Sequence, residues 1–163
     1  MITMSLMATI ATMTSTNSKR LIVVVGPTGS GKTALAIALA RHYGAPIIST
    51  DSRQVYRGMP IGTAQPTTDE LSLATHYFIA DREPEDDFNC GRYEVEALAL
   101  LERLFVDNDY VVAVGGSGLY VKALCEGMDN LPEADEELRQ SLKQRLESEG
   151  IEPLFEELRR LDG

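Results

Sequence analysis

The residues best suited to chemistry form a glycine-rich octapeptide, GPTGSGKT, at positions 26–33. It fits the pattern G-x-x-x-x-G-K-[ST], in which backbone N–H groups converge on phosphate oxygens. The lysine adds a point charge at the terminal phosphate, and the last hydroxyl suits Mg²⁺. We therefore predict a phosphate-binding loop, with Lys32 and Thr33 in catalytic roles and Thr33 facing the metal. The loop comprises Gly26, Pro27, Thr28, Gly29, Ser30, Gly31, Lys32 and Thr33.

A second candidate group is the carboxylate of Asp51, the sole acidic residue among the first 60. Asp51 comes just after the apolar run 45–49, and the octapeptide comes just after the apolar run 21–25. In an open parallel sheet, the loops that follow the strands meet at the carboxyl edge. We expect Asp51 to face the phosphate loop, where it accepts a proton or orders a metal-bound water. A structural role stays open, because aspartate often accepts local backbone hydrogen bonds in turns and caps.

Two strand–turn–helix units position these groups. Residues 21–25 form a β-branched run typical of a parallel strand buried on both faces, and residues 32–43 form an Ala/Leu-rich helix that ends before Gly44. Residues 110–114 repeat the plan, followed by GGSG and a helical segment at 119–125. Runs at 45–49 and 76–80 predict further strands. The sequence predicts an α/β fold, P-loop NTPase-like, with three layers and a parallel sheet.

Helical periodicity predicts the remaining elements. Residues 91–107 form a helix with one apolar face, and residues 57–68 are mostly loop. Beyond Pro132, leucines at four-residue spacing predict a helix up to Gly150, and residues 153–161 form a last short one. We expect a disordered leader over residues 1–20 and a folded domain over residues 21–163. The expected face at 91–107 comprises Ala97, Leu98, Leu101, Leu104 and Phe105.

Composition excludes several classes of protein. The 163 residues, 44% of them hydrophobic, suffice for one domain with a core, and no apolar run is long enough to span a membrane. Cys90 and Cys125 exclude a disulfide scaffold, so we expect a cytoplasmic monomer with reduced thiols. The net charge is −10, yet residues 1–60 hold six basic residues and residues 61–163 hold nine basic and 24 acidic ones. This distribution argues against a broad nucleic-acid-binding face but leaves room for a local contact.

Three segments occur in an order that resembles the tRNA dimethylallyltransferases, also called tRNA isopentenyltransferases. They are GPTGSGKT, ISTDSRQVYRGMPIGTAQPT and GGSGLYVKALCEG. The second is the most specific, because nucleotide kinases share the first and lack D-S-x-Q-x-Y-x-x-x-x-I-G-T-A-x-P. FNCGRY at 88–93 is also similar to the family's helix entry, and the resemblance extends from about residue 21 to the end.

The resemblance implies transfer of a dimethylallyl group from dimethylallyl diphosphate to N6 of adenosine 37, beside the tRNA anticodon, with release of diphosphate. It makes Asp51 the general base, and Lys32 and Thr33 a clamp for the leaving group together with Mg²⁺. Ser117 stands where the family commonly has threonine. The residues implied at the tRNA anticodon stem-loop are Asp51, Ser52, Arg53, Gln54, Ser117 and Arg139.

The family's chains continue for about as many residues again, with arginines that clamp the diphosphate and a region that grips tRNA. We therefore expect a catalytic part truncated before the C-terminal tRNA-gripping part, with poor activity alone. One alternative is a P-loop small-molecule kinase, with Asp51 at the acceptor hydroxyl and Arg53 and Arg57 over the phosphates. Another is a non-catalytic phosphate-binding fragment. The loop binds phosphate groups whatever molecule carries them, so ATP is also expected to bind.

Overall fold

The computed structural model describes residues 9–14, 19–128 and 135–162. The chain divides into two compact units, residues 1–128 and 129–163, and each is described by itself. This division differs from the single domain over 21–163 that the sequence predicts. None of the helices in the described ranges is long and apolar enough to cross a membrane.

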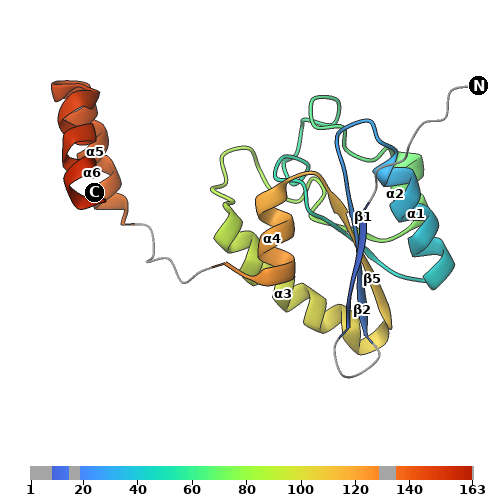
Figure 1. The fold of residues 1–163 in the computed structure, drawn as a ribbon. Helices are drawn as coiled ribbons and strands as arrows, with labels where there is room; N and C mark the ends of the chain where they lie inside the picture. Colours follow the sequence, from blue (N-terminus) through green and yellow to red (C-terminus); the bar gives the residue numbers. More distant parts are fainter. Residues whose placement is uncertain (1–8, 15–18, 129–134, 163) are drawn as a thin grey trace, which may run out of the picture. The chain divides into compact units, whose positions relative to one another are not determined.

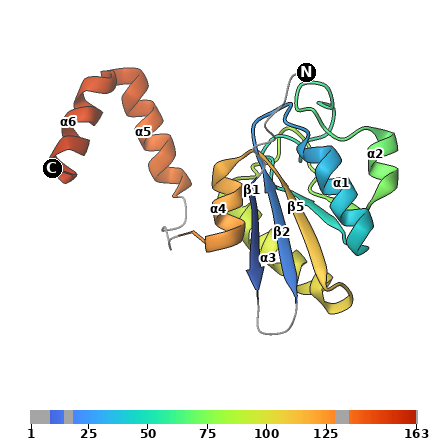
Figure 2. The same cartoon turned by 45° about the vertical axis from the view of Figure 1, so that its right-hand side comes forward.

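A five-stranded sheet forms the centre of the first unit, in the order β1-β2-β5-β3-β4 (Figures 1 and 2). The strands are β1 (Thr9–Thr14), β2 (Arg20–Val25), β3 (Ile47–Ser49), β4 (His76–Tyr77) and β5 (Tyr110–Gly115). The strands from β2 to β5 are parallel, as predicted. Strand β1 lies instead within the expected leader and pairs antiparallel with β2, from Thr9↔Val25 to Thr14↔Arg20. Its run TIATMT is rich in β-branched residues, which favour an edge strand.

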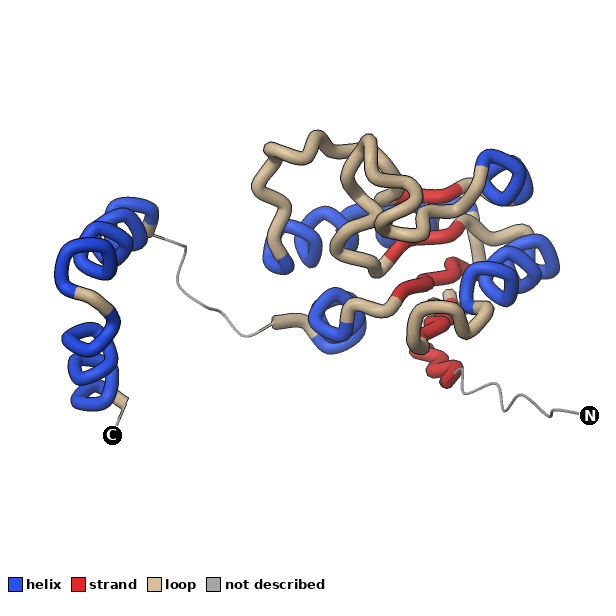
Figure 3. Tube along the Cα trace, turned by 90° about the horizontal axis from the view of Figure 1, so that it is seen from above, coloured by secondary structure: helices blue, strands red, loops and turns tan. Residues whose placement is uncertain are grey.

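Helices cover both faces of the sheet, which gives the predicted three-layer α/β arrangement (Figure 3). Helix α1 (Lys32–Tyr43) shares one core with Ile22 and Val24. Helices α3 (Cys90–Asp107) and α4 (Gly118–Glu126) share the other core with Leu21 and Val23. Consecutive residues of β2 thus alternate between the two cores, as a strand buried on both faces requires.

The helix ends follow local capping signals. Helix α1 ends at Gly44, whose φ of 63° lets its N–H bond Ala40 O. Helix α3 begins after Asn89, whose side chain accepts from Arg92 N at 3.0 Å. A short helix that the sequence does not predict, α2 (Thr68–Leu73), begins with a capping box between Thr67 and Glu70.

The buried face of α3 is turned slightly from the predicted one. Ala97 and Leu101 are buried as expected, but Leu98 is 40% exposed, whereas Tyr93 and Leu100 are buried. The face runs through positions 93, 97, 100 and 101, so Leu98 falls at its margin. The prediction for Leu98 is therefore wrong.

Two helices form the second unit, α5 (Glu136–Glu149) and α6 (Ile151–Leu161). They meet at Gly150, which has a φ of 81°, and Arg145 bonds Glu157 across them at 2.7 Å. The leucines predicted at four-residue spacing, Leu138, Leu142 and Leu146, line a groove with Leu154. Pro132 lies outside the described residues.

Candidate active site

The phosphate-binding loop joins β2 to α1 at the carboxyl edge of the sheet. Gly29 and Gly31 have φ values of 79° and 83°, a conformation that favours glycine. Helix α1 begins at Lys32 with no side-chain cap and no acidic residue in its first turn. The positive end of the helix dipole and its N–H groups therefore face the loop unneutralised, which suits an anion.

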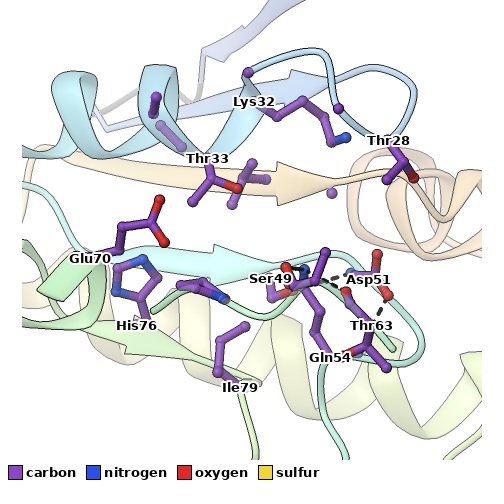
Figure 4. A pocket seen from close by; sticks show the side chains of 18 residues that line it. Thr28, Lys32, Thr33, Ser49, Asp51, Gln54, Thr63, Glu70, His76 and Ile79 are labelled. Atoms are coloured by element: carbon purple, nitrogen blue, oxygen red, sulfur yellow. Dashed lines mark hydrogen bonds between the residues drawn. The ribbon is translucent and has the colours of Figure 1, made fainter. Parts of the chain in front are cut away.

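The loop forms one wall of a cavity of about 380 Å³. Lys32 and Thr28 lie on one side of this cavity, and Asp51 and Gln54 lie on the facing side (Figure 4). The Lys32 ammonium donates to Pro27 O within the loop at 2.7 Å. The same ammonium would contact a phosphate bound by the loop. The cavity therefore brings Lys32 and Thr33 together with Asp51, as their positions after parallel strands predict.

Asp51 is held by a turn of its own backbone. Its Oδ1 accepts from Arg53 N at 2.9 Å and from Gln54 N at 3.3 Å, and its N–H donates to Ser49 Oγ at 3.3 Å. The Asx turn that the sequence leaves open as an alternative is present. Both turn bonds end on Oδ1.

Gln54 fixes a neighbouring loop. Its Oε1 accepts from Ser49 Oγ at 3.1 Å, and its Nε2 donates to Ala64 O at 2.9 Å and Thr63 O at 3.3 Å. Ala64 has a φ of 50°, which is strained for a residue with a Cβ and needs such support. Both ends of the amide are therefore engaged within the chain, whereas the family resemblance implies a contact of Gln54 to the tRNA.

The remaining residues predicted at the tRNA lie in different places. Ser52 and Ser117 bond each other, since Ser117 Oγ accepts from Ser52 N at 2.9 Å and donates to Ser52 Oγ at 3.1 Å. They join the loops after β3 and β5. Arg53 is exposed and lines a second cavity. Arg139 lies on α5, in the second unit.

Strand β5 approaches the end of β3 closely enough to require glycine. Thr50 N donates to Val114 O at 2.8 Å. A Cβ on Gly115 would lie 2.3 Å from Thr50 Oγ1 and 2.5 Å from its carbonyl carbon. The glycine that follows the apolar run of β5 thus lets the two strands bring their loops together.

A tyrosine pair anchors the same strand end from the side of α3 and α4. Tyr93 OH donates to Ser49 O at 3.1 Å, and Tyr120 OH donates to Phe88 O at 3.0 Å. The rings stack with centroids 4.3 Å apart. Burial raises the pKa of Tyr120 to about 12 and raises the pKa of Tyr93 as well, so both hydroxyls remain donors at neutral pH.

The polar residues of the cavity that sequence reasoning missed include Glu70 and His76. His76 Nδ1 lies 2.8 Å from Ala74 O, and because a carbonyl only accepts, Nδ1 carries the proton. His76 Nε2 is buried without a hydrogen-bond partner in the described part of the chain. Glu70 Oε2 accepts from Thr67 N at 2.8 Å. The signal for Glu70 was visible as the capping pattern T-x-x-E, whereas a lone histidine gave none.

The described residues include no group of three or more acidic, histidine or cysteine side chains that could hold a metal. Thr33 does line the cavity beside the phosphate loop. Mg²⁺ commonly takes few protein ligands and completes its octahedron with phosphate oxygens and water. The residues present therefore fit an ion that arrives with a diphosphate.

Comparison with known proteins gives a consistent result. The IPP transferase family matches residues 54–163, and ATPases associated with various cellular activities match residues 22–77. A tRNA dimethylallyltransferase of Cytophaga hutchinsonii is 49% identical over 145 residues, which are 89% of this chain and 48% of the relative. One of Flavobacterium johnsoniae is 49% identical over 144 residues, which are 88% and 47%. The chain spans about half the length of the curated relatives it matches.

Solved structures resemble the fold in the same way. The tRNA isopentenylpyrophosphate transferase of Bacillus halodurans superimposes with a TM-score of 0.66 at 35% identity, over 89% of this chain and 48% of its own. A eukaryotic dimethylallyltransferase described as acting on tRNA gives a TM-score of 0.63 at 25% identity, over 72% and 30%.

Proposed function

This chain belongs to the IPP transferase family, and from that premise we propose that it is the catalytic part of a tRNA dimethylallyltransferase. The reaction transfers a dimethylallyl group from dimethylallyl diphosphate to the N6 amine of the adenosine beside the anticodon. The observation that supports this proposal is one cavity with the phosphate loop on one side and Asp51 on the other.

The transfer needs a clamp for the leaving group. The bond between the allylic carbon and the diphosphate oxygen breaks, and negative charge develops on the departing diphosphate. The backbone N–H groups of the loop, the start of α1 and the Lys32 ammonium stabilise this charge. Mg²⁺ bound with the diphosphate would supply further charge neutralisation, with Thr33 as its protein ligand.

The transfer also needs a base opposite the clamp. A new bond forms between N6 and the allylic carbon, and the amine gives up one proton. Asp51 Oδ2 takes that proton, while the turn bonds on Oδ1 hold the carboxylate in place. The adenine must leave its stack to reach Asp51, as bases do in enzymes that modify them.

We extend the proposal to a location in the cytoplasm. Cys90 and Cys125 are both free, and burial raises the pKa of each thiol, so both stay protonated at neutral pH. Free thiols of this kind suit a reducing compartment.

The proposal predicts that the chain binds dimethylallyl diphosphate through Lys32. By calorimetry in the presence of Mg²⁺, Lys32→Ala should weaken binding roughly 10- to 100-fold, because a charge-assisted hydrogen bond is lost. Lys19→Ala is the matched control, because Lys19 pairs with Asp109 before the start of β2, at the other end of the strand. Equal affinity of the Lys32→Ala variant and the parent would contradict the proposal. Transfer of the ATP γ-phosphate to a small alcohol would establish the kinase alternative instead.

A further inference from the structure

A second cavity, of about 450 Å³, lies beside the first. It is lined by Arg53, Tyr56, Met59, Gly62 and Thr63. Thr63 also lines the cavity of Asp51, and Arg53 follows Asp51 by two residues. The two cavities therefore share Thr63 as a common wall residue.

One wall of this cavity is a loop, residues 59–64, that is closed by its own hydrogen bonds. Thr63 donates to Met59 O twice, from its N–H at 3.2 Å and its hydroxyl at 2.8 Å. Ala64 N donates to Ile61 O at 3.2 Å, and Gln54 holds the carbonyls of Thr63 and Ala64 from outside. The loop is thus a fixed surface whose position is coupled to the residues around Asp51.

The loop displays apolar side chains to solvent. Ile61 is 96% exposed and Met59 is 39% exposed. Single exposed apolar residues are common, but Met59 lines the second cavity together with Tyr56 and the exposed Arg53, and Ile61 lies two residues further along the same loop. Such a combination on a rigid loop beside a reaction site is typical of a recognition surface.

Tyr56 is already held in place for stacking. Its ring packs at the edge of the core, and its hydroxyl donates to Asp86 O at 3.3 Å. An aromatic ring fixed in advance loses little conformational freedom when a flat ligand stacks on it. Arg53 adds a positive charge at the rim, which complements an RNA backbone.

We propose that the second cavity binds an unpaired nucleobase, the one next to the target adenosine, with Tyr56 as its stacking surface and Ile61 as a wedge. This inference rests on the proposed function, which requires the adenine to leave its stack and reach Asp51. Its neighbour then loses a stacking partner, and an apolar surface next to Asp51 can replace it. Aromatic walls and apolar wedges are the usual means by which proteins hold splayed bases.

The test is photo-crosslinking to an anticodon stem-loop that carries 5-iodouridine next to the target adenosine, with the chain extended by the C-terminal half of the Cytophaga hutchinsonii relative so that the stem-loop is held. The principal adduct should map to Tyr56 or Met59. Ile61→Ser and Tyr56→Leu should each lower the yield at least about fivefold, as loss of a base-stacking contact predicts. Val106→Ser is the matched control, because Val106 is 75% exposed near the end of α3, and it should stay within about twofold of the parent.

Two outcomes would overturn the inference. Adducts could map instead to Tyr43, which is 41% exposed on α1, with a yield that Ile61→Ser does not change. This result would contradict nucleobase binding in the second cavity and leave the proposed function intact. In the protein extended with the C-terminal half of the Cytophaga hutchinsonii relative, binding of the stem-loop no tighter than binding of a paired duplex of the same length would overturn both. Ile61→Ser keeps the test decisive if Tyr56→Leu fails to fold, because the Ile61 side chain is almost fully exposed.

Discussion

The two oxygens of the Asp51 carboxylate have different surroundings. Oδ1 accepts two backbone hydrogen bonds from the turn, at 2.9 and 3.3 Å, and Asp51 as a whole lines the cavity. From the sequence alone, a role in the turn and a role as proton acceptor are alternative interpretations of Asp51. Both turn bonds end on the same oxygen, so the role of general base that we propose for Asp51 is compatible with its place in the turn.

Gly115 permits the closest backbone approach near the site, and its replacement gives a residue-level prediction. Gly115→Ala should lower the free energy of unfolding by about 1–3 kcal/mol or more, because the new Cβ would overlap the buried Thr50. Urea unfolding followed by circular dichroism measures this. Gly118→Ala is the control, because a Cβ there meets nothing within 4 Å and adds helix propensity to α4. Equal stability of the two variants would contradict the close approach.

Local patterns were enough to predict several elements. Helix α1 has the predicted bounds, because the lysine after Gly31 and the glycine at 44 mark its two ends. Strand β1 was missed because TIATMT is recognisable as a strand only once β2 is there to pair with it. Leu98 was misassigned because the direction in which α3 faces the sheet depends on Tyr93, whose partners come from distant parts of the chain.

The candidate site shows the same division. That Lys32 and Asp51 would face one cavity followed from the rule that loops after parallel strands share an edge. The role of Gln54 could not be predicted, because its amide binds carbonyls nine and ten residues away in a strained loop. A strand beginning at His76 was predicted, but a lone histidine gives no sign that the pairing of β4 with β3 brings it to the cavity.

Helix α3 is tied to the end of β3 through Tyr93, and this gives a prediction at the level of elements. Tyr93→Phe keeps the stacking on Tyr120 but removes the bond to Ser49 O. The free energy of unfolding should fall by about 1 kcal/mol, as measured by urea denaturation. Tyr43→Phe is the control, because Tyr43 is 41% exposed. A Tyr93→Phe variant as stable as the parent would show that this bond is dispensable.

At the scale of the whole molecule, length and charge bear on RNA binding. The chain covers 48% of the Cytophaga hutchinsonii relative, and residues 61–163 hold nine basic against 24 acidic residues. RNA affinity draws heavily on contacts between basic side chains and phosphates. We therefore expect most of the grip on tRNA to come from the part of the family's length that this chain does not span.

A chimera tests this expectation. Extending the chain with the C-terminal half of the Cytophaga hutchinsonii relative should raise single-turnover transfer to an anticodon stem-loop by at least about a hundredfold, because the target base is then held in alignment. Dimethylallyl diphosphate binding should change far less, since the phosphate loop lies within the present chain. Equal transfer rates for the chain and the chimera would place recognition within residues 1–163.

The most direct test of the account is the rate at which a labelled dimethylallyl group moves to the stem-loop when Asp51 is replaced in the extended protein. Asp51→Asn keeps an oxygen for the two turn bonds but cannot take the proton from N6. Asp51→Asn should lower single-turnover transfer roughly 10²- to 10⁴-fold, while dimethylallyl diphosphate binding stays near the parent value. Asp107→Asn is the control, because Asp107 is exposed at the end of α3. Turnover by Asp51→Asn within a few-fold of the parent would show that Asp51 only shapes the turn, and would contradict the proposed mechanism.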